Sequence, residues 1–230
     1  MQTLIERLST VKTHESGEKT VAKTAIVLAG GVSSRFGQDK GVLELSGKPL
    51  LKHVVDAVNP VVDETIVVTS SQERAANYAA IVSSGVRFAV DVCESKSPLV
   101  GALTGFGIAT GQYSLLLPFD MPFISREVLS LLFELCEGKA AVIPRWPNGN
   151  VEPLHAVYQT KLALEAAKSA VAEGKLTMRA MIEKLRGVRY VSTLVIQQLD
   201  PDLSTFFNIN TLADLKKAAA IVKLRKPKGC

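Results

Sequence analysis

The chain has 230 residues, of which 47% are hydrophobic and 21% charged, a composition typical of a globular protein with a full hydrophobic core. No apolar run approaches the roughly 18 residues that a membrane-spanning helix needs, and residues 1–20 lack the hydrophobic stretch of a signal peptide. The composition therefore argues against a membrane protein or a secreted one, and we expect a cytoplasmic protein.

The net charge of +5 comes from one end of the chain. Residues 216–230 contain six Lys or Arg and no acidic residue, which leaves 21 basic against 22 acidic residues in the rest. We interpret this end as a solvated helix face with a frayed terminus, with weak binding of a polyanion as the alternative, and we expect no nucleic-acid partner. Cys93, Cys136 and Cys230 have no metal-ligand spacing and suit a reducing compartment.

The sequence divides into one large domain and two short ends. Residues 1–22 are polar with a weak helical pattern, so we expect an appendage that is flexible or forms one short helix. Residues 223–230 form a basic tail. Residues 23–222 contain no internal repeat and no low-complexity linker, and we therefore expect them to form a single domain.

The segment from residue 23 to residue 40 carries the strongest functional signal. The run KTAIVLA, residues 23–29, is apolar and β-branched, which predicts a short strand covered on both faces. Gly30 and Gly31 then allow a sharp turn that brings backbone N–H groups close to an anion, and Arg35 and Lys40 add positive charge. The spacing matches neither G-x-x-x-x-G-K-[ST] nor G-x-G-x-x-G, so we predict a phosphate-binding loop of another type. The alternative is that the two glycines form only a tight turn after the strand.

Helix and strand patterns alternate after this loop. A helical pattern covers residues 50–59, and short apolar runs predict strands at 65–69 and 86–90, with another helix at 72–83 between them. This β-α-β alternation predicts an α/β fold with a mostly parallel central sheet flanked by helices.

A glycine-rich helix is predicted to follow. Ser97 is its expected N-cap and Pro98 its first residue, where the missing N–H does no harm. Gly101, Gly105 and Gly107 each cost about 1 kcal/mol of helix propensity. Close packing against the sheet or a ligand would explain them, and a merely poor helix is the alternative.

Three predicted strands end in polar side chains. Ligands bind at the carboxyl ends of strands in such sheets, so Thr69 and Asp91 should lie at the same edge as the glycine loop, with Asp91 placed to accept hydrogen bonds from a base. The strand that begins at Tyr113 delivers Asp120 to this edge. Mg²⁺ on a nucleotide takes one or two carboxylates, so we predict that Asp120 binds Mg²⁺, with an ordinary cap or turn carboxylate as the alternative.

The pattern changes near residue 140. The loop 145–150 contains Trp146, which would lie over a second substrate or belong to a plain hairpin loop. The remaining elements expected in this part are strands at 140–144, 152–158 and 188–194 and helices at 160–172 and 177–185.

The last element is preceded by two asparagines. Asn208 and Asn210 lie in the segment FFNIN, which we expect near the site. Thr211 and Asp214 have the spacing of a capping box, with Asp in place of the usual Glu or Gln, and predict the start of the last helix.

Four motifs, taken together, resemble the molybdenum-cofactor guanylyltransferases, the MobA family. They are LAGGVSSRFGQDKGVLELSGKPLL, PFDMPF, EPLHAVY and FNINTLADL, and they follow the order of that family over residues 24 to about 220. The first motif alone indicates only the wider nucleotidyltransferase superfamily, and the FNINT ending narrows it. Phe119 departs from the small residue or Cys that is common before the aspartate in this family.

The resemblance implies a single Rossmann-like domain in which GTP, with Mg²⁺, reacts with a molybdopterin-type cofactor to give the guanine dinucleotide and pyrophosphate. It also implies a role for each matching residue. Nucleotide contacts would come from Leu28, Ala29, Gly30 and Gly31, phosphate contacts and catalysis from Arg35 and Lys40, guanine recognition from Asp91, metal binding and catalysis from Asp120, and acceptor or metal contacts from Asn208 and Asn210. Thr69 is expected to bind the nucleotide from its place at the same strand edge.

The chemistry agrees with this interpretation. An acceptor phosphate is already an anionic nucleophile, so no Ser-His-Asp or Cys-His set is needed, and catalysis would depend on in-line positioning and charge stabilisation. The enzyme alternatives are a cytidylyltransferase acting on the same cofactor and a sugar-phosphate nucleotidylyltransferase. A nucleotide-binding but inactive subunit is the alternative of another class. Proteins that deliver the cofactor or mature molybdoenzymes are the partners to expect.

Overall fold

The structure, a computed structural model, describes residues 22–30, 39–91 and 97–225. Most of the predicted amino-terminal appendage, residues 31–38 of the predicted phosphate loop and residues 226–230 of the basic tail lie outside these ranges. None of the helices in the described ranges combines the length and the hydrophobicity that crossing a lipid bilayer requires.

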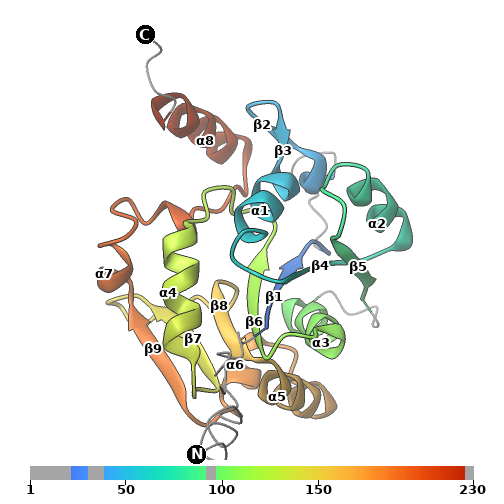
Figure 1. Ribbon diagram of the computed structural model, residues 1–230, viewed down its shortest axis with the longest axis vertical. Helices are drawn as coiled ribbons and strands as arrows, with labels where there is room; N and C mark the ends of the chain where they lie inside the picture. Colours follow the sequence, from blue (N-terminus) through green and yellow to red (C-terminus); the bar gives the residue numbers. More distant parts are fainter. Residues whose placement is uncertain (1–21, 31–38, 92–96, 226–230) are drawn as a thin grey trace, which may run out of the picture.

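A seven-stranded sheet forms the centre of the fold, in the order β5-β4-β1-β6-β8-β7-β9 (Figure 1). The pairings β5-β4, β4-β1, β1-β6 and β7-β9 are parallel, whereas β8 runs antiparallel to both β6 and β7. The predicted mostly parallel α/β sheet is therefore confirmed. The strands are β1 (Lys23–Leu28), β4 (Glu64–Thr69), β5 (Arg87–Val90), β6 (Tyr113–Pro118), β7 (Ala141–Arg145), β8 (Ala156–Gln159) and β9 (Val188–Ser192).

Helices cover both faces of this sheet, as the alternating sequence pattern predicts. The helices α1 and α4 pack on one face, and α3, α5 and α6 pack on the other. A small hairpin, β2 (Glu44–Leu45) and β3 (Lys48–Pro49), lies beside α8. The helical elements are η1 (Lys40–Val42), α1 (Leu50–Val58), α2 (Gln72–Ala79), α3 (Pro98–Ile108), α4 (Arg126–Cys136), α5 (Thr160–Ala172), α6 (Met178–Ile182), α7 (Thr193–Ile196), η2 (Ser204–Phe206) and α8 (Leu212–Arg225).

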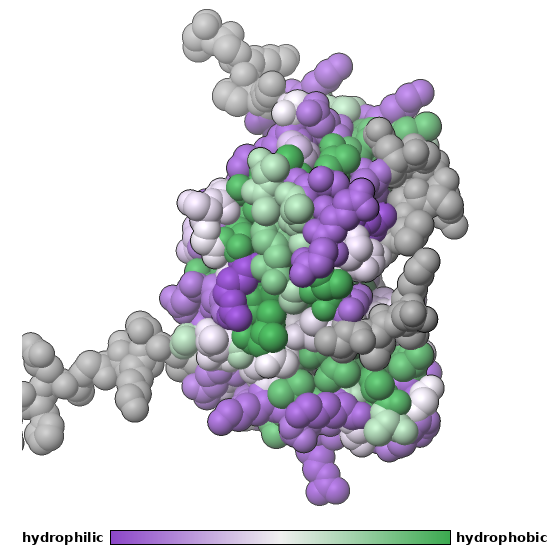
Figure 2. Space-filling view, turned by 90° about the vertical axis from the view of Figure 1, so that its right-hand side faces the viewer, coloured by the Kyte–Doolittle hydropathy of each residue, from purple (hydrophilic) through white to green (hydrophobic). Residues whose placement is uncertain are grey.

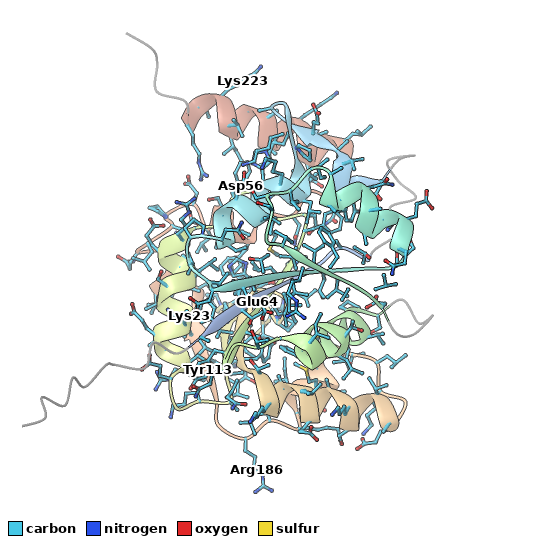
Figure 3. All side chains as sticks on the ribbon, turned by 45° about the vertical axis from the view of Figure 1, so that its right-hand side comes forward. Lys23, Asp56, Glu64, Tyr113, Arg186 and Lys223 are labelled. Carbon is cyan, nitrogen blue, oxygen red and sulfur yellow. The ribbon has the colours of Figure 1, made fainter. Side chains whose placement is uncertain are left out.

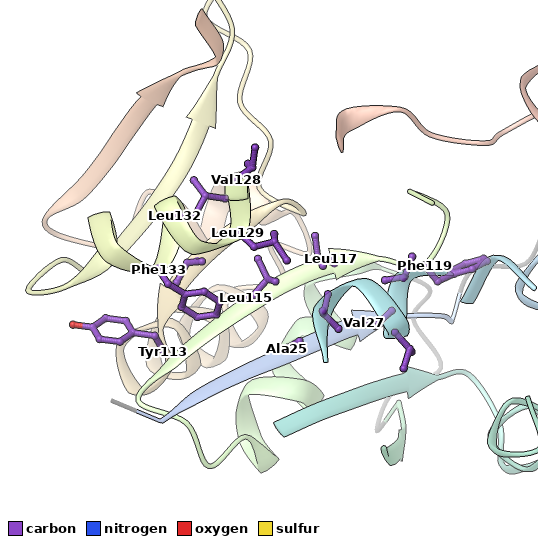
Figure 4. Close-up of a cluster of buried hydrophobic side chains, with 14 of the residues drawn as sticks. Ala25, Val27, Tyr113, Leu115, Leu117, Phe119, Val128, Leu129, Leu132 and Phe133 are labelled. Atoms are coloured by element: carbon purple, nitrogen blue, oxygen red, sulfur yellow. The ribbon is translucent and has the colours of Figure 1, made fainter. Parts of the chain in front are cut away.

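The alternation of side chains along β1 explains the two layers of core. Ala25 and Val27 point to the α1 and α4 face, where Figure 4 shows them together with Leu115 and Leu117 of β6. Ile26 points to the opposite face and packs against α3. Burying each of the larger side chains contributes about 1.5–3 kcal/mol, so the central strands are strongly fixed.

The helix α3 lies unusually close to β1, and this explains one of its glycines. A Cβ atom added at Gly105 would overlap Cγ2 of Ile26, so only glycine allows this approach. The predicted N-cap is confirmed, since the Ser97 hydroxyl accepts a hydrogen bond from the Leu99 amide at 3.2 Å. For Gly105, packing against the sheet is therefore the correct alternative.

Two predicted strands are shorter than expected. Residues 152–155 form a turn, with the His155 amide donating to the Glu152 carbonyl at 3.1 Å, and β8 begins only at Ala156. Pro153 has no N–H to donate to a neighbouring strand, which explains the late start. The strand predicted at 188–194 also ends early, because the side chain of Ser192, the last residue of β9, caps α7.

Polar contacts join the amino-terminal ends of the central strands. At the amino-terminal edge, the Glu64 carboxylate accepts hydrogen bonds from Thr24, Thr110 and Arg87, and Lys23 lies nearby at the start of β1 (Figure 3). These contacts tie the ends of several strands to one another. The amino-terminal edge is therefore closed by the protein's own polar groups.

The side of the molecule that carries α2, β5 and α3 shows hydrophobic surface bordered by hydrophilic residues (Figure 2). β5 is the terminal strand of the sheet on this side, and its residues Phe88 and Val90 are only half-buried. Apolar surface at this position is what an edge strand leaves accessible.

Candidate functional site

The carboxyl edge of the parallel strands holds the predicted site residues. The backbone pairing continues one residue past each strand: Ala29 donates to Val68 at 2.7 Å, and Asp91 donates to Thr69 at 2.8 Å. The Phe119 amide likewise donates to the Leu28 carbonyl, at 3.2 Å. These bonds fix the backbone from which Asp91 and Asp120 project. The structure therefore places both carboxylates at the sheet edge where α/β folds bind ligands.

Three residues from distant parts of the chain meet beside this edge. Lys40 Nζ donates to Asp120 Oδ2 at 2.6 Å and to Asn210 Oδ1 at 3.0 Å. The segment that carries Asn210 is held in turn, since the Ile209 amide donates to the Asp120 carbonyl at 3.0 Å. The Lys40 and Asp120 side chains are only 8% and 15% exposed, so this ion pair is partly shielded from water.

Asp120 retains an oxygen that fits a cation. Its Oδ1 atom is buried and has no hydrogen-bond partner within the described residues. Those residues contain no cluster of three His, Cys, Asp or Glu that would hold a metal alone. A divalent cation such as Mg²⁺ would therefore take one carboxylate here and complete its shell with phosphate oxygens and water, which is how Mg²⁺ usually binds together with a nucleotide.

Asp91 lies between two glycines. The Cβ position of Gly30 is 3.2 Å from one carboxylate oxygen, and that of Gly101 is 3.4 Å from the other. Asp91 Oδ1 and the hydroxyl of Thr104 on α3 are both buried without a standard hydrogen bond in the described part of the chain. Burial raises the pKa of Asp91, and the nearby Thr104 hydroxyl partly opposes that rise. The carboxylate thus offers free acceptor positions to a ligand with N–H donors.

The other predicted nucleotide residues have scaffold contacts. The Thr69 hydroxyl is buried and donates to the backbone carbonyls of Ser71, at 3.0 Å, and Ala89, at 3.3 Å. Leu28 is the last residue of β1 and is half-buried, and Ala29, which follows it, is fully buried. Gly31 and Arg35 lie outside the described residues, so their predicted roles stay predictions.

The segment before α8 follows the sequence prediction. The Asp214 carboxylate accepts from the amides of Asn210, at 3.0 Å, and Thr211, at 2.8 Å, while the Asp214 amide donates to the Thr211 hydroxyl at 3.1 Å. This is the predicted capping box. Asn208 is half-buried in the same segment, beside the Ile209 amide that holds Asp120.

The loop with Trp146 is fixed by its own contacts. The indole N–H donates to Glu152 at 2.6 Å, and the ring packs edge-on against Phe206 with 5.6 Å between centroids. His155 contacts Phe206 from another side and shares a 3.3 Å hydrogen bond with the Thr205 hydroxyl. Complete burial lowers the pKa of His155 to about 3. These residues hold β8 and η2 together, which favours the structural interpretation of Trp146.

Sequence patterns missed one set of contacts to the Lys40 turn. Asp39 accepts hydrogen bonds from the Gly41 amide and from the Tyr78 hydroxyl. An aspartate directly before a turn is a recognisable cap signal. Tyr78 lies 39 residues further along the chain and reads only as an apolar residue of an amphipathic helix. No local pattern could have paired the two.

Comparison with known proteins identifies the family of this chain. The family model of the MobA-like NTP transferase domain matches residues 25–188. A probable molybdenum cofactor guanylyltransferase of Methanosarcina mazei is 35% identical over 210 residues, covering 89% of this chain and 93% of that protein. A molybdenum cofactor guanylyltransferase of Desulfosudis oleivorans is 32% identical over 203 residues, covering 88% of this chain and 96% of that protein.

A solved structure gives the same picture. The crystal structure of molybdopterin-guanine dinucleotide biosynthesis protein A from Archaeoglobus fulgidus superposes with a TM-score of 0.76 at 28% identity. The match covers 87% of this chain and 99% of that one. The similarity thus extends over most of the chain.

Proposed function

We propose, since the chain belongs to the MobA-like NTP transferase family, that it is a molybdenum cofactor guanylyltransferase. It transfers GMP from GTP to the phosphate of a molybdopterin-type cofactor and releases pyrophosphate. The observation that carries this proposal is the meeting of Lys40, Asp120 and Asn210 at the sheet edge that also holds Asp91.

The reaction needs charge stabilisation more than proton transfer. An anionic oxygen of the acceptor phosphate attacks the α-phosphorus of GTP, the bond from that phosphorus to the bridging oxygen breaks, and the electron pair leaves with pyrophosphate. Lys40 would offset the charge that develops on the leaving group, together with Arg35, for which the sequence predicts the same role. Asp120 would hold Mg²⁺, which supplies further positive charge to the phosphates when bound.

Asp91 supports guanine as the base. Guanine presents two adjacent donors, N1–H and the N2 amino group, and a carboxylate has two oxygens to accept them. Gly30 and Gly101 pack closely against the carboxylate, since a Cβ atom at either would lie 3.2–3.4 Å from its oxygens, and they hold it at the sheet edge. Cytosine presents only its N4 amino group as a donor on the corresponding edge.

Asn210 supports an acceptor phosphate beside Lys40. Its side-chain oxygen accepts from Lys40, so its amide nitrogen keeps two N–H donors for a further ligand. Asn208 lies two residues away in the same segment and would extend this surface. We also infer that the protein acts in the cytoplasm and exchanges cofactor with proteins that deliver it or mature molybdoenzymes.

Pyrophosphate release tests the proposed function. The protein is incubated with Mg²⁺, molybdopterin-type cofactor and each nucleoside triphosphate in turn, and pyrophosphate and dinucleotide are measured. Parallel reactions contain a sugar phosphate in place of the cofactor. We expect both products with GTP. Preference for CTP would identify a cytidylyltransferase, products with a sugar phosphate would identify the other enzyme class, and nucleotide binding without turnover would identify an inactive subunit.

A further inference from the structure

The turn that carries Lys40 is too short to hold itself in place. η1 consists of three residues, and a single helical turn has little stability of its own. Its cap comes from Asp39, whose Oδ1 atom accepts a hydrogen bond from the Gly41 amide at 2.9 Å. The backbone position of Lys40 therefore depends on where the Asp39 carboxylate is held.

The helix α2 holds that carboxylate from one side. The Tyr78 hydroxyl donates to Asp39 Oδ1 at 2.6 Å, and Arg74 Nε lies 3.3 Å from Oδ2. Residues four apart lie on one face of a helix, so both groups point at the same carboxylate. Tyr78 is fully buried, and burial together with Asp39 raises the pKa of Tyr78, which keeps its hydroxyl protonated as a donor.

The turn also lies directly on the tyrosine ring. A Cβ atom added at Gly41 would be 2.5 Å from the Tyr78 hydroxyl oxygen and 2.6–2.7 Å from two ring carbons. Real Cβ atoms do not come so close, so only glycine fits between the turn and the ring. Tyr78 thus supports η1 both by a hydrogen bond through Asp39 and by contact with Gly41.

Lys40 is consequently held at both ends. Its backbone is held through Asp39 and Tyr78, and its ammonium lies on Asp120 and Asn210. We propose that Asp39 and Tyr78 are positioning residues that aim the Lys40 ammonium at the phosphates during nucleotidyl transfer. This inference rests on the proposed function and adds two residues that act through Lys40.

A tyrosine-to-phenylalanine substitution tests this. Tyr78→Phe keeps the ring but removes the hydroxyl that holds Asp39. A misplacement of about 1 Å costs up to about 100-fold in rate, and we expect a loss of about tenfold in kcat with KM for GTP within about threefold. Hydrogen exchange of the Gly41 amide, measured by NMR, should quicken by about tenfold, because its acceptor is released. This second measurement does not depend on turnover.

Tyr113→Phe is the matched control. The Tyr113 hydroxyl accepts from the Gly138 amide at 3.0 Å, at the amino-terminal end of β6 and away from the site. This variant also loses one hydrogen bond of a largely buried tyrosine, but it should leave both kcat and Gly41 exchange unchanged. Gly41→Ala perturbs the same contact from the other side and should lower kcat as Tyr78→Phe does.

The outcomes separate the two proposals. Normal kcat and normal Gly41 exchange in Tyr78→Phe would overturn the positioning role while leaving the proposed function intact. Wild-type protein that releases no pyrophosphate from GTP would contradict the proposed function, and Gly41 exchange would then decide by itself whether Tyr78 holds the turn. If Tyr78→Phe does not fold, Gly41→Ala decides, and normal kcat in that variant would overturn the inference.

Discussion

The ammonium of Lys40 lies 2.6 Å from the carboxylate of Asp120, with both side chains largely withdrawn from water. The residue proposed to bind phosphate and the residue proposed to bind the metal therefore neutralise each other. A nucleotide that arrives with its cation supplies both with new partners of opposite charge. The pair is thus arranged to exchange one internal ion pair for two contacts with the substrate.

Removing the lysine should reduce turnover strongly. We expect Lys40→Ala to lower kcat by about 100-fold or more, because the charge on the leaving pyrophosphate loses its protein cation. Steady-state pyrophosphate release measures this. Lys48→Ala is the control: Lys48 of the β2-β3 hairpin forms a partly exposed ion pair with Asp56 of α1, and this variant should keep normal kcat. Near-normal turnover in Lys40→Ala would refute the phosphate role.

The hydroxyl of Thr104 should tune the pH dependence of GTP binding. It opposes the rise in the pKa of Asp91 that burial causes, so Thr104→Val should raise the pKa of Asp91 further. A protonated Asp91 accepts guanine donors less well, and affinity should decline at a higher pH than in the wild type. Titration with a fluorescent GTP analogue between pH 4 and 8 measures the midpoint. Superimposable profiles would contradict this, and Thr104→Ser should restore the wild-type midpoint.

Burial of His155 should make the protein sensitive to acid. The pKa of His155 is lowered to about 3 in the folded state, against 6.5 as the ordinary value. Below pH 6.5, His155 therefore binds a proton in the unfolded chain but stays neutral in the folded chain. The free energy of unfolding consequently decreases as pH falls from 6.5 toward 3. The slope from this residue is about 1.4 kcal/mol per pH unit.

Urea unfolding at pH 7.5, 6.5, 5.5 and 4.5 tests this. His155→Gln cannot take up the proton, so its free energy of unfolding should fall less steeply with acid than that of the wild type, whatever the difference at pH 7.5. Carboxylates contribute equally to both proteins and cancel in the comparison. Parallel curves for the two proteins would show that His155 is not the acid-sensitive group.

The two neighbouring glycines of α3 should respond oppositely to alanine. Gly105→Ala forces a methyl group into Ile26 and should destabilise the protein by about 1–3 kcal/mol. A Cβ at Gly107 meets only Leu164, at 4.0 Å, so Gly107→Ala should stabilise the helix by up to about 1 kcal/mol. Chemical denaturation measures both. Equal effects would mean that α3 does not approach β1 as closely as described.

Much of the scaffold could be predicted from local patterns. Short apolar runs between helical patterns predict the parallel strands. The carboxyl ends of parallel strands share one edge of the sheet, so the sequence also predicts that Asp91 and Asp120 lie at the same edge. The N-cap at Ser97 and the capping box at Thr211 depend only on residues three or fewer positions apart. Such features are local, and sequence spacing determines them.

Contacts between distant elements were not predictable in the same way. The late start of β8 follows from Pro153, but its antiparallel insertion between β6 and β7 depends on the whole sheet. Likewise, no periodicity pairs Lys40 with Asp120 or Tyr78 with Asp39. Those pairings arise from the packing of α2 and of the segment before α8 around the strand ends.

The hydrogen bond from Lys40 to Asn210 joins residues 170 positions apart in the sequence. During synthesis, Lys40 and Asp120 therefore leave the ribosome well before the asparagine that joins them. A nascent chain can form β1, β4 and β6 early, yet it holds an incomplete site until residue 210 has emerged. With Asn210 in its proposed role, competence to bind the acceptor would arise late in translation, after most of the sheet has had time to fold.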